Sequence, residues 1–526
     1  MNSSFVESLE IRRLFAGVIL EANGRLGTTT GWMQTMANEI TANLGGPSQV
    51  PQFVLTISAN PTTGALVPSI QQVAGTGTPQ TSSSGEIIVL INYYSVSTSV
   101  NYGSAYIGSV IANYLETTPV DGILLTSLPI NEIGLSRGAA VLDQVSNFLG
   151  QSGIWVDQET ELDPEPITAQ GDPPSTIYSN VAFADDYWRN DGSASQQDDG
   201  NPINGAYNLN TTWLDTDDAG YTTPHLALGG YYNGTIDLTA TQGGDGPIYS
   251  AWYGNSPTMP ARNETGFVYN SLVGAPRPLT GVWAASGGTG ARTAVAQVGA
   301  QWGNATDLDV TSGNIVTTGN NIDVSFLHQD RGGGADNITF YLDSDRNPYN
   351  NNFVANLGTF SLAQAAAITQ GSETLSTAGV APGTYWLAAK VTNGNSDTRY
   401  TYESITAPLT IQGPTVAAVD GSVVLKNIAG TTGLGSLAGF KVTLTQHIKK
   451  QKIQKFAAVT NAAGLFSFNN LQPSSDDVLQ IAARKGYKLA PHARATDTVK
   501  VQTGQITSGV VFSEDLIIPP VKKKKK

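Results

Sequence analysis

The pattern of apolar and polar positions divides the chain into two regions. Between residues 30 and 275, strand-like and helix-like periods alternate, which predicts layers of helix and sheet. Residues 53–57 and 87–91 read as strands, and the second run is continuously apolar, as expected of a buried parallel strand. Apolar residues at helical spacing predict two helices, through Trp32, Met36, Ile40 and Leu44 and through Ile107, Val110, Ile111, Tyr114 and Leu115.

After about residue 280 the pattern changes. Glycine-rich spacers separate short alternating segments such as 322–326 and 385–391, which is typical of an all-β sandwich. A second break falls at residues 412–414, and more strand-like segments follow it. The predicted organisation is an N-terminal export-type segment, an α/β domain, an Ig-like β-sandwich, a second β-sandwich and a basic tail, at residues 1–29, 30–280, 281–413, 414–517 and 518–526.

Composition narrows the classes of function. The formal net charge of −14 over 526 residues disfavours nucleic-acid binding. The absence of cysteine excludes disulfides, thiolate metal sites and a cysteine nucleophile. No run approaches the ~18 consecutive apolar residues of a membrane-spanning helix, so no transmembrane span is expected.

The pentapeptide Gly134-Leu135-Ser136-Arg137-Gly138 carries the candidate chemistry. A strand-like run, 128–133, precedes it, and a helical stripe within 141–149 follows it. This context is typical of a nucleophile elbow, in which a sharp turn between strand and helix exposes a serine. In a chain with 57 glycines, a chance match is the competing interpretation.

A serine hydroxyl needs a base and an acid to act as a nucleophile. His225 is the only histidine between residues 30 and 280, and it follows Ser136 in the chain. For the acid, the residue pattern leaves Asp163 and Asp185 open, because each follows a strand-like segment. The oxyanion hole is expected to use the backbone N–H of Arg137 and one near Tyr93.

These segments resemble the pancreatic-lipase branch of the α/β-hydrolases. Residues 87–95, the 134–138 pentapeptide and Leu162-Asp163-Pro164 carry the resemblance, over roughly residues 50–275. It implies an α/β-hydrolase fold with a mostly parallel sheet and flanking helices, and it favours Asp163 as the acid. Leu135 stands where the family usually has His, and Arg137 where it usually has Leu. Without cysteine no disulfide-bounded lid can form, so lipid specificity is not implied.

Two further resemblances concern the ends of the chain. Residues 9–15 are similar to the LEPR-XLL segment of large exported bacterial proteins, with Ile11 in place of Pro and Phe15 in place of the last Leu. An amphipathic first helix is the alternative interpretation. Residues 418–515 resemble the prealbumin-like sandwiches of the SdrD B and Cna B type. The predicted fold class is therefore a multidomain protein, α/β-hydrolase first, followed by two all-β sandwiches.

Two other features leave alternatives open. Asp343, Asp345 and Asn347 have the spacing of calcium ligands, but Pro348 and Val354 break the EF-hand pattern, so an Asx-rich turn competes with a calcium site. The aromatic tracts at 229–236 and 251–255 are candidates for pocket lining or for ordinary packing. No other cofactor is expected.

We expect a secreted or cell-surface bacterial protein carrying a serine hydrolase. The predicted enzyme is an esterase or lipase-like hydrolase that acts through an acyl-enzyme on a small-molecule, lipid or polysaccharide ester. Ser136 is the expected nucleophile, His225 the base and Asp163 the acid. The C-terminal β domains are expected to mediate cell-surface association. The alternative is a non-catalytic surface, matrix or adhesion protein whose hydrolase-like domain is only a scaffold.

Overall fold

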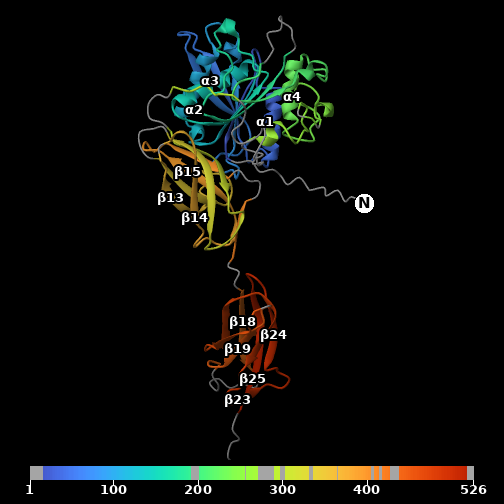
Figure 1. Cartoon of the computed structure of the whole chain (residues 1–526), viewed down its shortest axis with the longest axis vertical. Coiled ribbons are helices and arrows are strands. Elements are labelled where there is room, and N and C mark those ends of the chain that lie inside the picture. Colours follow the sequence, from blue (N-terminus) through green and yellow to red (C-terminus); the bar gives the residue numbers. More distant parts are fainter. Residues whose placement is uncertain are drawn as a thin grey trace, which may run out of the picture. The chain divides into compact units, whose positions relative to one another are not determined.

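The structure, a computed structural model, describes residues 16–190, 201–254, 256, 258–270, 290–296, 302–330, 336–363, 365–403, 408–413, 417–426, 437–449 and 451–517. Two compact units make up the chain. One comprises Met1–Asn314, Asn321–Ser376 and Thr384–Leu409, and the other comprises Ile315–Asn320, Thr377–Gly383 and Thr410–Lys526. Each unit is described by itself below (Figure 1).

The first unit is built on an eight-stranded sheet with the order β3-β2-β4-β1-β5-β6-β7-β8. The edge pair β2–β3 is antiparallel, and the other neighbouring pairs are parallel. The strands are β1 (Val18–Ala22), β2 (Gln52–Ala59), β3 (Leu66–Ala74), β4 (Ile87–Asn92), β5 (Ile130–Leu135), β6 (Val156–Leu162), β7 (Val181–Trp188) and β8 (Tyr207–Asn210). The α-helices of the described residues are α1 (Trp32–Asn43), α2 (Ser104–Thr117), α3 (Arg137–Gln151) and α4 (Pro224–Asn233). Six short 3-10 helices lie at Tyr94–Val96, Leu125–Ser127, Thr168–Gln170, Thr212–Asp215, Ser250–Trp252 and Gly266–Tyr269.

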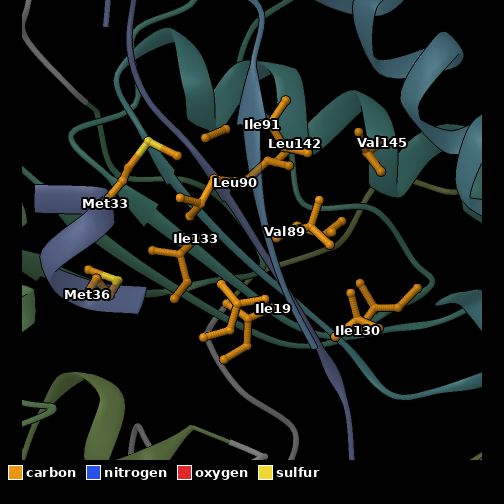
Figure 2. Close-up of a cluster of buried hydrophobic side chains, with 14 of the residues drawn as sticks. Ile19, Met33, Met36, Val89, Leu90, Ile91, Ile130, Ile133, Leu142 and Val145 are labelled. Atoms are coloured by element: carbon orange, nitrogen blue, oxygen red, sulfur yellow. The ribbon is translucent and has the colours of Figure 1, made fainter. Parts of the chain in front are cut away.

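The helices cover both faces of the sheet (Figure 1). Helix α2 packs beside α3, and α1 packs beside α4. Figure 2 shows the core that results, with Met33 and Met36 of α1 and Leu142 and Val145 of α3 surrounding apolar side chains of the central strands. These side chains are almost completely removed from solvent. Their burial supplies the main favourable free energy of folding for this layer.

Strand β1 departs from the predicted organisation. The sequence assigns residues 1–29 to an export-type segment, but Val18–Ala22 is a fully buried strand between β4 and β5. The strand is short, since a buried parallel strand needs only about five residues. Residues 1–15, including the LEPR-XLL-like segment, lie outside the described residues.

The predicted fold class is wrong. The structure is 41% strand and 16% helix, and its described residues contain only four α-helices, so it gives no clear α/β-hydrolase signature. The predicted strands and helices up to Leu162 are present, but the alternation of strand and helix does not continue beyond them. The connection between β6 and β7, for example, contains one 3-10 turn and no α-helix. The protein is a multidomain chain in which strands predominate.

The middle region is a β-sandwich. Its strands are β9 (Asn304–Val310), β10 (Ile315–Thr317), β11 (Asn321–Asp330), β12 (Asn337–Asp343), β13 (Phe353–Ser361), β14 (Ala365–Ser376), β15 (Gly383–Thr392), β16 (Thr398–Tyr402) and β17 (Leu409–Gln412). In the first unit, β13-β12-β15-β16 form one sheet and β14-β11-β9 the other. The rings of Phe326 and Phe340 meet between the two sheets, with centroids 5.7 Å apart.

Polar contacts join this sandwich to the eight-stranded sheet within the first unit. Arg399 of β16 is buried and donates to the carbonyl oxygens of Trp155 (3.0 Å) and Leu128 (3.2 Å). It also forms an ion pair with Asp157 at 3.1 Å. Asn304 donates to the carbonyl oxygen of Gly153 at 2.6 Å. The predicted boundary at residue 281 therefore does not separate two compact units.

The second unit contains the other β-sandwich. Its strands are β18 (Ala417–Leu425), β19 (Lys441–Gln446), β20 (Gln454–Val459), β21 (Leu465–Leu471), β22 (Ser474–Ile481), β23 (Tyr487–Leu489), β24 (Thr496–Val501) and β25 (Ile506–Leu516). They form two four-stranded sheets, β21-β18-β25-β23 and β20-β19-β22-β24, which share one apolar core. The strands occupy the range predicted for this sandwich, 414–517, and the predicted basic tail, 518–526, lies outside the described residues.

Two carboxyl groups of the first unit, the buried Glu403 and the partly buried Glu39, predict how its stability depends on pH. Burial raises the pKa of Glu403 to about 8, and burial with repulsion from Asp237 raises that of Glu39 to about 8. The folded state therefore holds these protons to higher pH than the unfolded chain does. We expect the free energy of unfolding to be greatest near about pH 5 and to fall as the pH rises to about 8.

Urea unfolding at several pH values, followed by circular dichroism, measures this decline. Glu403→Gln keeps a neutral side chain at every pH and should flatten part of it. A free energy of unfolding that rises steadily between those two pH values would contradict the assignment of neutral buried carboxyls.

Candidate active site

Ser136 occupies a strained turn between β5 and α3. Its φ and ψ are 58° and −128°, in a region that residues other than glycine rarely adopt. Its backbone N–H donates to the carbonyl oxygen of Leu162 at 3.0 Å, which fixes the turn to the end of β6. The side chain opens into a pocket. Strained backbone of this kind persists only where surrounding contacts enforce it, and it is concentrated at functional sites.

The flanking glycines are needed for close packing. A Cβ atom on Gly134 would lie 2.4 Å from the Cα of Ala139, and one on Gly138 would lie 2.3 Å from the carbonyl oxygen of Ala22. Gly24, in the loop after β1, lies against Ser136 in the same way, since its added Cβ would be 2.8 Å from the Cβ of Ser136. Backbone segments therefore hold the turn from both sides.

His225 lies in the first turn of α4. Thr223 is the N-cap, and its side chain accepts from the N–H of Leu226, while Pro224 begins the helix. The imidazole Nδ1 lies 2.6 Å from Oδ2 of Asp163, and this carboxylate is fully buried. A hydrogen bond from Nδ1–H to a carboxylate leaves Nε2 as the nitrogen that can accept a proton.

Asp163 directly follows β6 and receives three donors. Besides His225, the backbone N–H of Arg189 donates to Oδ1 at 3.1 Å, and the Arg189 Nε donates to Oδ2 at 2.9 Å. The Arg189 guanidinium also pairs with Asp215. Asp185, the alternative acid, lies elsewhere and accepts from the hydroxyl of Thr160 at 2.7 Å. The structure thus brings His225 to Asp163 and not to Asp185.

Ser136 and His225 line one pocket, of about 530 Å³. Loop residues 23–28 after β1 form one wall, and Glu165, Ile167, Leu226 and Asp245 contribute to the rest. Leu135 also lines it. Ser136 and His225 line the same cavity, and they are not hydrogen-bonded to each other in the described structure. Hydrogen bonds of catalytic groups are often long before substrate binds.

The structure places the two residues expected to supply oxyanion donors differently. Arg137 is the first residue of α3, so its backbone N–H has no partner within the helix. Tyr93 follows β4, which is separated from β5 by β1, and it does not line the pocket. Its hydroxyl instead donates to the carbonyl oxygen of Asn23 at 2.5 Å. The loop at residues 23–27 was missed by sequence reasoning, although Gly24 soon after the apolar residues 18–20 is a signal for it.

The Arg137 side chain reinforces this region. It is buried and forms a bidentate ion pair with Asp172, at 2.7 and 2.9 Å. It also donates to the carbonyl oxygens of Ser97 and Tyr102. Burial alone would raise the pKa of Asp172, but hydrogen bonds from Arg137 and from backbone N–H groups lower it below its usual range. The first residue of α3 is thus fixed to the loops after β4 and β6.

The structure shows where the aromatic tracts and the calcium candidates lie. Tyr231, Tyr232 and Trp252 of the aromatic tracts are fully buried in the core and do not line the pocket. The calcium candidates form a turn whose oxygens accept internal hydrogen bonds. Asp343 Oδ2 accepts from the hydroxyl of Tyr402 at 2.6 Å, and Asp345 Oδ2 accepts from the amide of Asn350 at 2.7 Å.

Among the described residues, no helix combines the length and the apolar character needed to cross a lipid bilayer. No protein-family model matches the sequence, and no curated protein matches it. The major plantain pollen allergen Pla l 1 is a similar solved structure, with 17% identity, coverage of 20% of this chain and 98% of the allergen, and a TM-score of 0.15. The fimbrial protein FimP from Actonomyces oris has 10% identity, coverage of 40% and 68%, and a TM-score of 0.18.

A tetra-tandem repeat from the extending region of a large adhesion protein has 9% identity, coverage of 38% and 57%, and a TM-score of 0.13. Likeness at these TM-scores carries no functional information. The family assignments made from the sequence, to the pancreatic-lipase branch, the LEPR-XLL proteins and the SdrD B or Cna B sandwiches, are wrong in that no family match supports them and the chain is mostly β. What is established is a multidomain protein with β-sandwich domains.

Packing around Ser136 predicts the effect of a single added methyl group. Gly138→Ala would place a Cβ against backbone atoms of the β1 end, which cannot move without shifting the central strand. We expect a loss of about 1–3 kcal/mol in the free energy of unfolding. Gly394→Ala, in the same unit at a position with no atom within 4 Å, is the matched control. Urea unfolding of both variants tests this, and equal effects would show that Gly138 is not held by close packing.

Proposed function

We propose that the pocket at Ser136 is the active site of a serine hydrolase, most simply an esterase. The observation that carries the proposal is that residues from distant parts of the chain place a serine and an Asp-bonded histidine in one pocket. Ser136, on a strained turn, opens into the pocket that His225 also lines, and the His225 Nδ1 lies 2.6 Å from Asp163. A nucleophile, a base and an orienting acid are the parts that acyl transfer requires.

The proposed reaction proceeds through an acyl-enzyme. The Ser136 hydroxyl attacks the carbonyl carbon of the ester while its proton passes to Nε2 of His225. The tetrahedral oxyanion is stabilised by the N–H of Arg137 and by backbone N–H groups of the loop after β1. Collapse of the intermediate expels the alcohol, which takes the proton from His225. A water molecule, activated by the same imidazole, then hydrolyses the acyl-enzyme.

Asp163 has a defined part in this scheme. Its carboxylate holds His225 in the tautomer with Nδ1–H and stabilises the imidazolium that forms during attack. Arg189 donates to the same carboxylate from its backbone and its side chain and so keeps Asp163 in place. Arg189 is accordingly a positioning residue.

The pocket lining favours a short or polar acyl group over a long lipid chain. Asparagine, glycine, threonine, arginine and two acidic residues make up most of the wall, and the apolar lining is limited to Leu26, Leu135, Ile167 and Leu226. The aromatic side chains of Tyr231, Tyr232 and Trp252, which were candidates for pocket lining, are buried in the core instead. Among the predicted substrates, a small-molecule or sugar ester therefore fits best.

The second candidate is a non-catalytic cell-surface or matrix protein. Two observations favour it. The first is that strands predominate in the chain, much of which forms sandwiches suited to spacing or adhesion. The second is that Arg189 already neutralises Asp163, while Ser136 and His225 are not hydrogen-bonded to each other in the described structure. In either case we propose that the protein acts outside the cell or at its surface.

Hydrolysis of short-chain p-nitrophenyl esters distinguishes the two candidates. We expect Ser136→Ala to abolish turnover and Asp163→Asn to lower kcat by about 10⁴-fold, because the histidine tautomer is then wrong. Asp185→Asn is the matched control, since this buried carboxylate accepts from the Thr160 hydroxyl, whereas His225 is hydrogen-bonded to Asp163. It should retain most of the activity.

Each outcome decides between the candidates. Absence of turnover in the parent protein across esters of graded chain length supports the non-catalytic candidate. Loss of turnover in Asp185→Asn with turnover retained in Asp163→Asn would overturn the proposed acid.

A further inference from the structure

A cluster of buried carboxylates lies beneath α3, apart from the pocket. Asp143 of α3 and Glu159 and Glu161 of β6 each bring one oxygen to within 4.8 Å of the others. All three side chains are almost completely removed from solvent. Like charges at such separations in a poorly solvated interior repel strongly unless a proton or a cation offsets them.

Two more carboxylates border the cluster. Asp186 of β7 pairs in register with Glu161, and Glu132 lies on β5, on the other side of β6. Both are fully buried. The hydroxyl of Ser146 is shared by Glu132 and Glu159, at 2.8 and 2.6 Å. Five carboxyl groups from four neighbouring elements therefore meet in one buried volume.

Hydrogen-bond donors are too few for these oxygens. Asp143 accepts from the backbone N–H of Thr176, and Asp186 Oδ2 accepts from that of Ile203. Within the part of the chain that the structure describes, no N–H or hydroxyl group donates to either oxygen of Glu161, to Oε1 of Glu159 or to Oδ1 of Asp186. Asp186 lies outside the group of three, and its unpartnered Oδ1 is an independent indication that the cluster lacks a ligand. Leaving such oxygens unpaired is costly in the interior.

Among the described residues, no ion pair brings a positive charge to the cluster. The ion pairs of the described residues join Arg137 to Asp172, Arg189 to Asp163 and Asp215, His225 to Asp163, and Arg399 to Asp157. None of them involves the five clustered carboxylates. The nearby arginine ion pairs belong to the pocket and to the sandwich contact.

We propose that Asp143, Glu159 and Glu161 bind a divalent cation of the calcium class, with Asp186 bordering the ion. The donor set consists of carboxylate oxygens alone, which hard cations such as Ca²⁺ and Mn²⁺ prefer and which suits zinc poorly. The ion would offset the mutual repulsion and give the unpartnered oxygens a ligand. It would also link α3, which begins beside Ser136, to β6, which ends beside Asp163. The proposal does not rest on the catalytic one.

The full chain, dialysed against EDTA and then titrated with CaCl₂ or MnCl₂ alone, tests the site. We expect about one tightly bound ion per chain by elemental analysis and a higher thermal midpoint of unfolding with the metal, because the ion binds the folded state preferentially. Glu161→Gln keeps the shape of the side chain and should weaken binding by about tenfold or more.

Two matched variants locate the effect. Glu86→Gln alters another buried carboxyl group outside the cluster and should leave the metal response unchanged. Asp345→Asn alters the Asx-rich turn, the other candidate for calcium, and should also leave it unchanged. A response that disappears in Asp345→Asn but persists in Glu161→Gln would overturn the assignment.

The wild-type chain decides the matter even if Glu161→Gln fails to fold. Folded wild-type protein that retains no metal and whose thermal midpoint is the same in EDTA, CaCl₂ and MnCl₂ would overturn the proposal. The carboxyl groups would then share protons instead, since burial raises the pKa values of Glu159 and Glu161.

Discussion

The left-handed backbone at Ser136 is the constraint on which the site depends. A serine at φ 58° is held there because β5, α3 and the loop after β1 approach one another too closely for any side chain at residues 24, 134 and 138. The turn places the hydroxyl in the pocket at the ends of the central strands. Residues of the loops that follow β1 and β6 line the same pocket. Strain at one residue is thus stabilised by packing that extends across the sheet.

A second constraint acts through Asp163. This carboxylate is fully buried and accepts from His225 and from two groups of Arg189, while Arg189 also pairs with Asp215. Removing one member would leave a buried charge without its partner, which typically costs several kcal/mol. The arrangement fixes His225 as firmly as it fixes Asp163. The same contacts therefore stabilise the network and orient the imidazole.

The carboxylate cluster beneath α3 sets a different demand on the same elements. Strand β6 has the sequence Val-Asp-Gln-Glu-Thr-Glu-Leu, in which five consecutive residues are polar. Every residue of the strand is nevertheless buried. Such a strand can be accommodated only if its charges are offset by protons or by an ion. Because β6 also carries Asp163 at its end, whatever neutralises the cluster contributes to holding that residue in place.

The sequence was informative where periodicity was strong. The helices at Trp32–Asn43, Ser104–Thr117 and Arg137–Gln151 and the strand before Ser136 follow from the spacing of their apolar residues. Strand β1 was missed because its five residues, four apolar and one Glu21, are too few to show a period of their own. The fold class was misjudged because the helical pattern ends after α3, apart from α4, while strands continue to residue 516.

The candidate site was predictable only in part. Motif, chain order and resemblance select Ser136, Asp163 and His225 as candidates, and the structure brings the last two into hydrogen-bond contact. Three features could not be predicted because they depend on which strands are neighbours in the sheet. They are the place of the loop at 23–27 in the pocket, the position of Tyr93 outside it, and the contact of Arg189 with Asp163. That order is set by long-range pairing, and no local pattern reveals it. The burial of Glu159 and Glu161 is hidden for the same reason.

The central claim is that Ser136 is an activated nucleophile. Its most direct test is to treat the folded protein with a fluorophosphonate and to locate the adduct by tandem mass spectrometry of its peptides. The account predicts a single adduct on Ser136, formed far faster than on other serines and absent when the protein is denatured before the reagent is added. An unmodified Ser136 in folded protein, or an adduct formed equally well on serines outside the pocket, would contradict it.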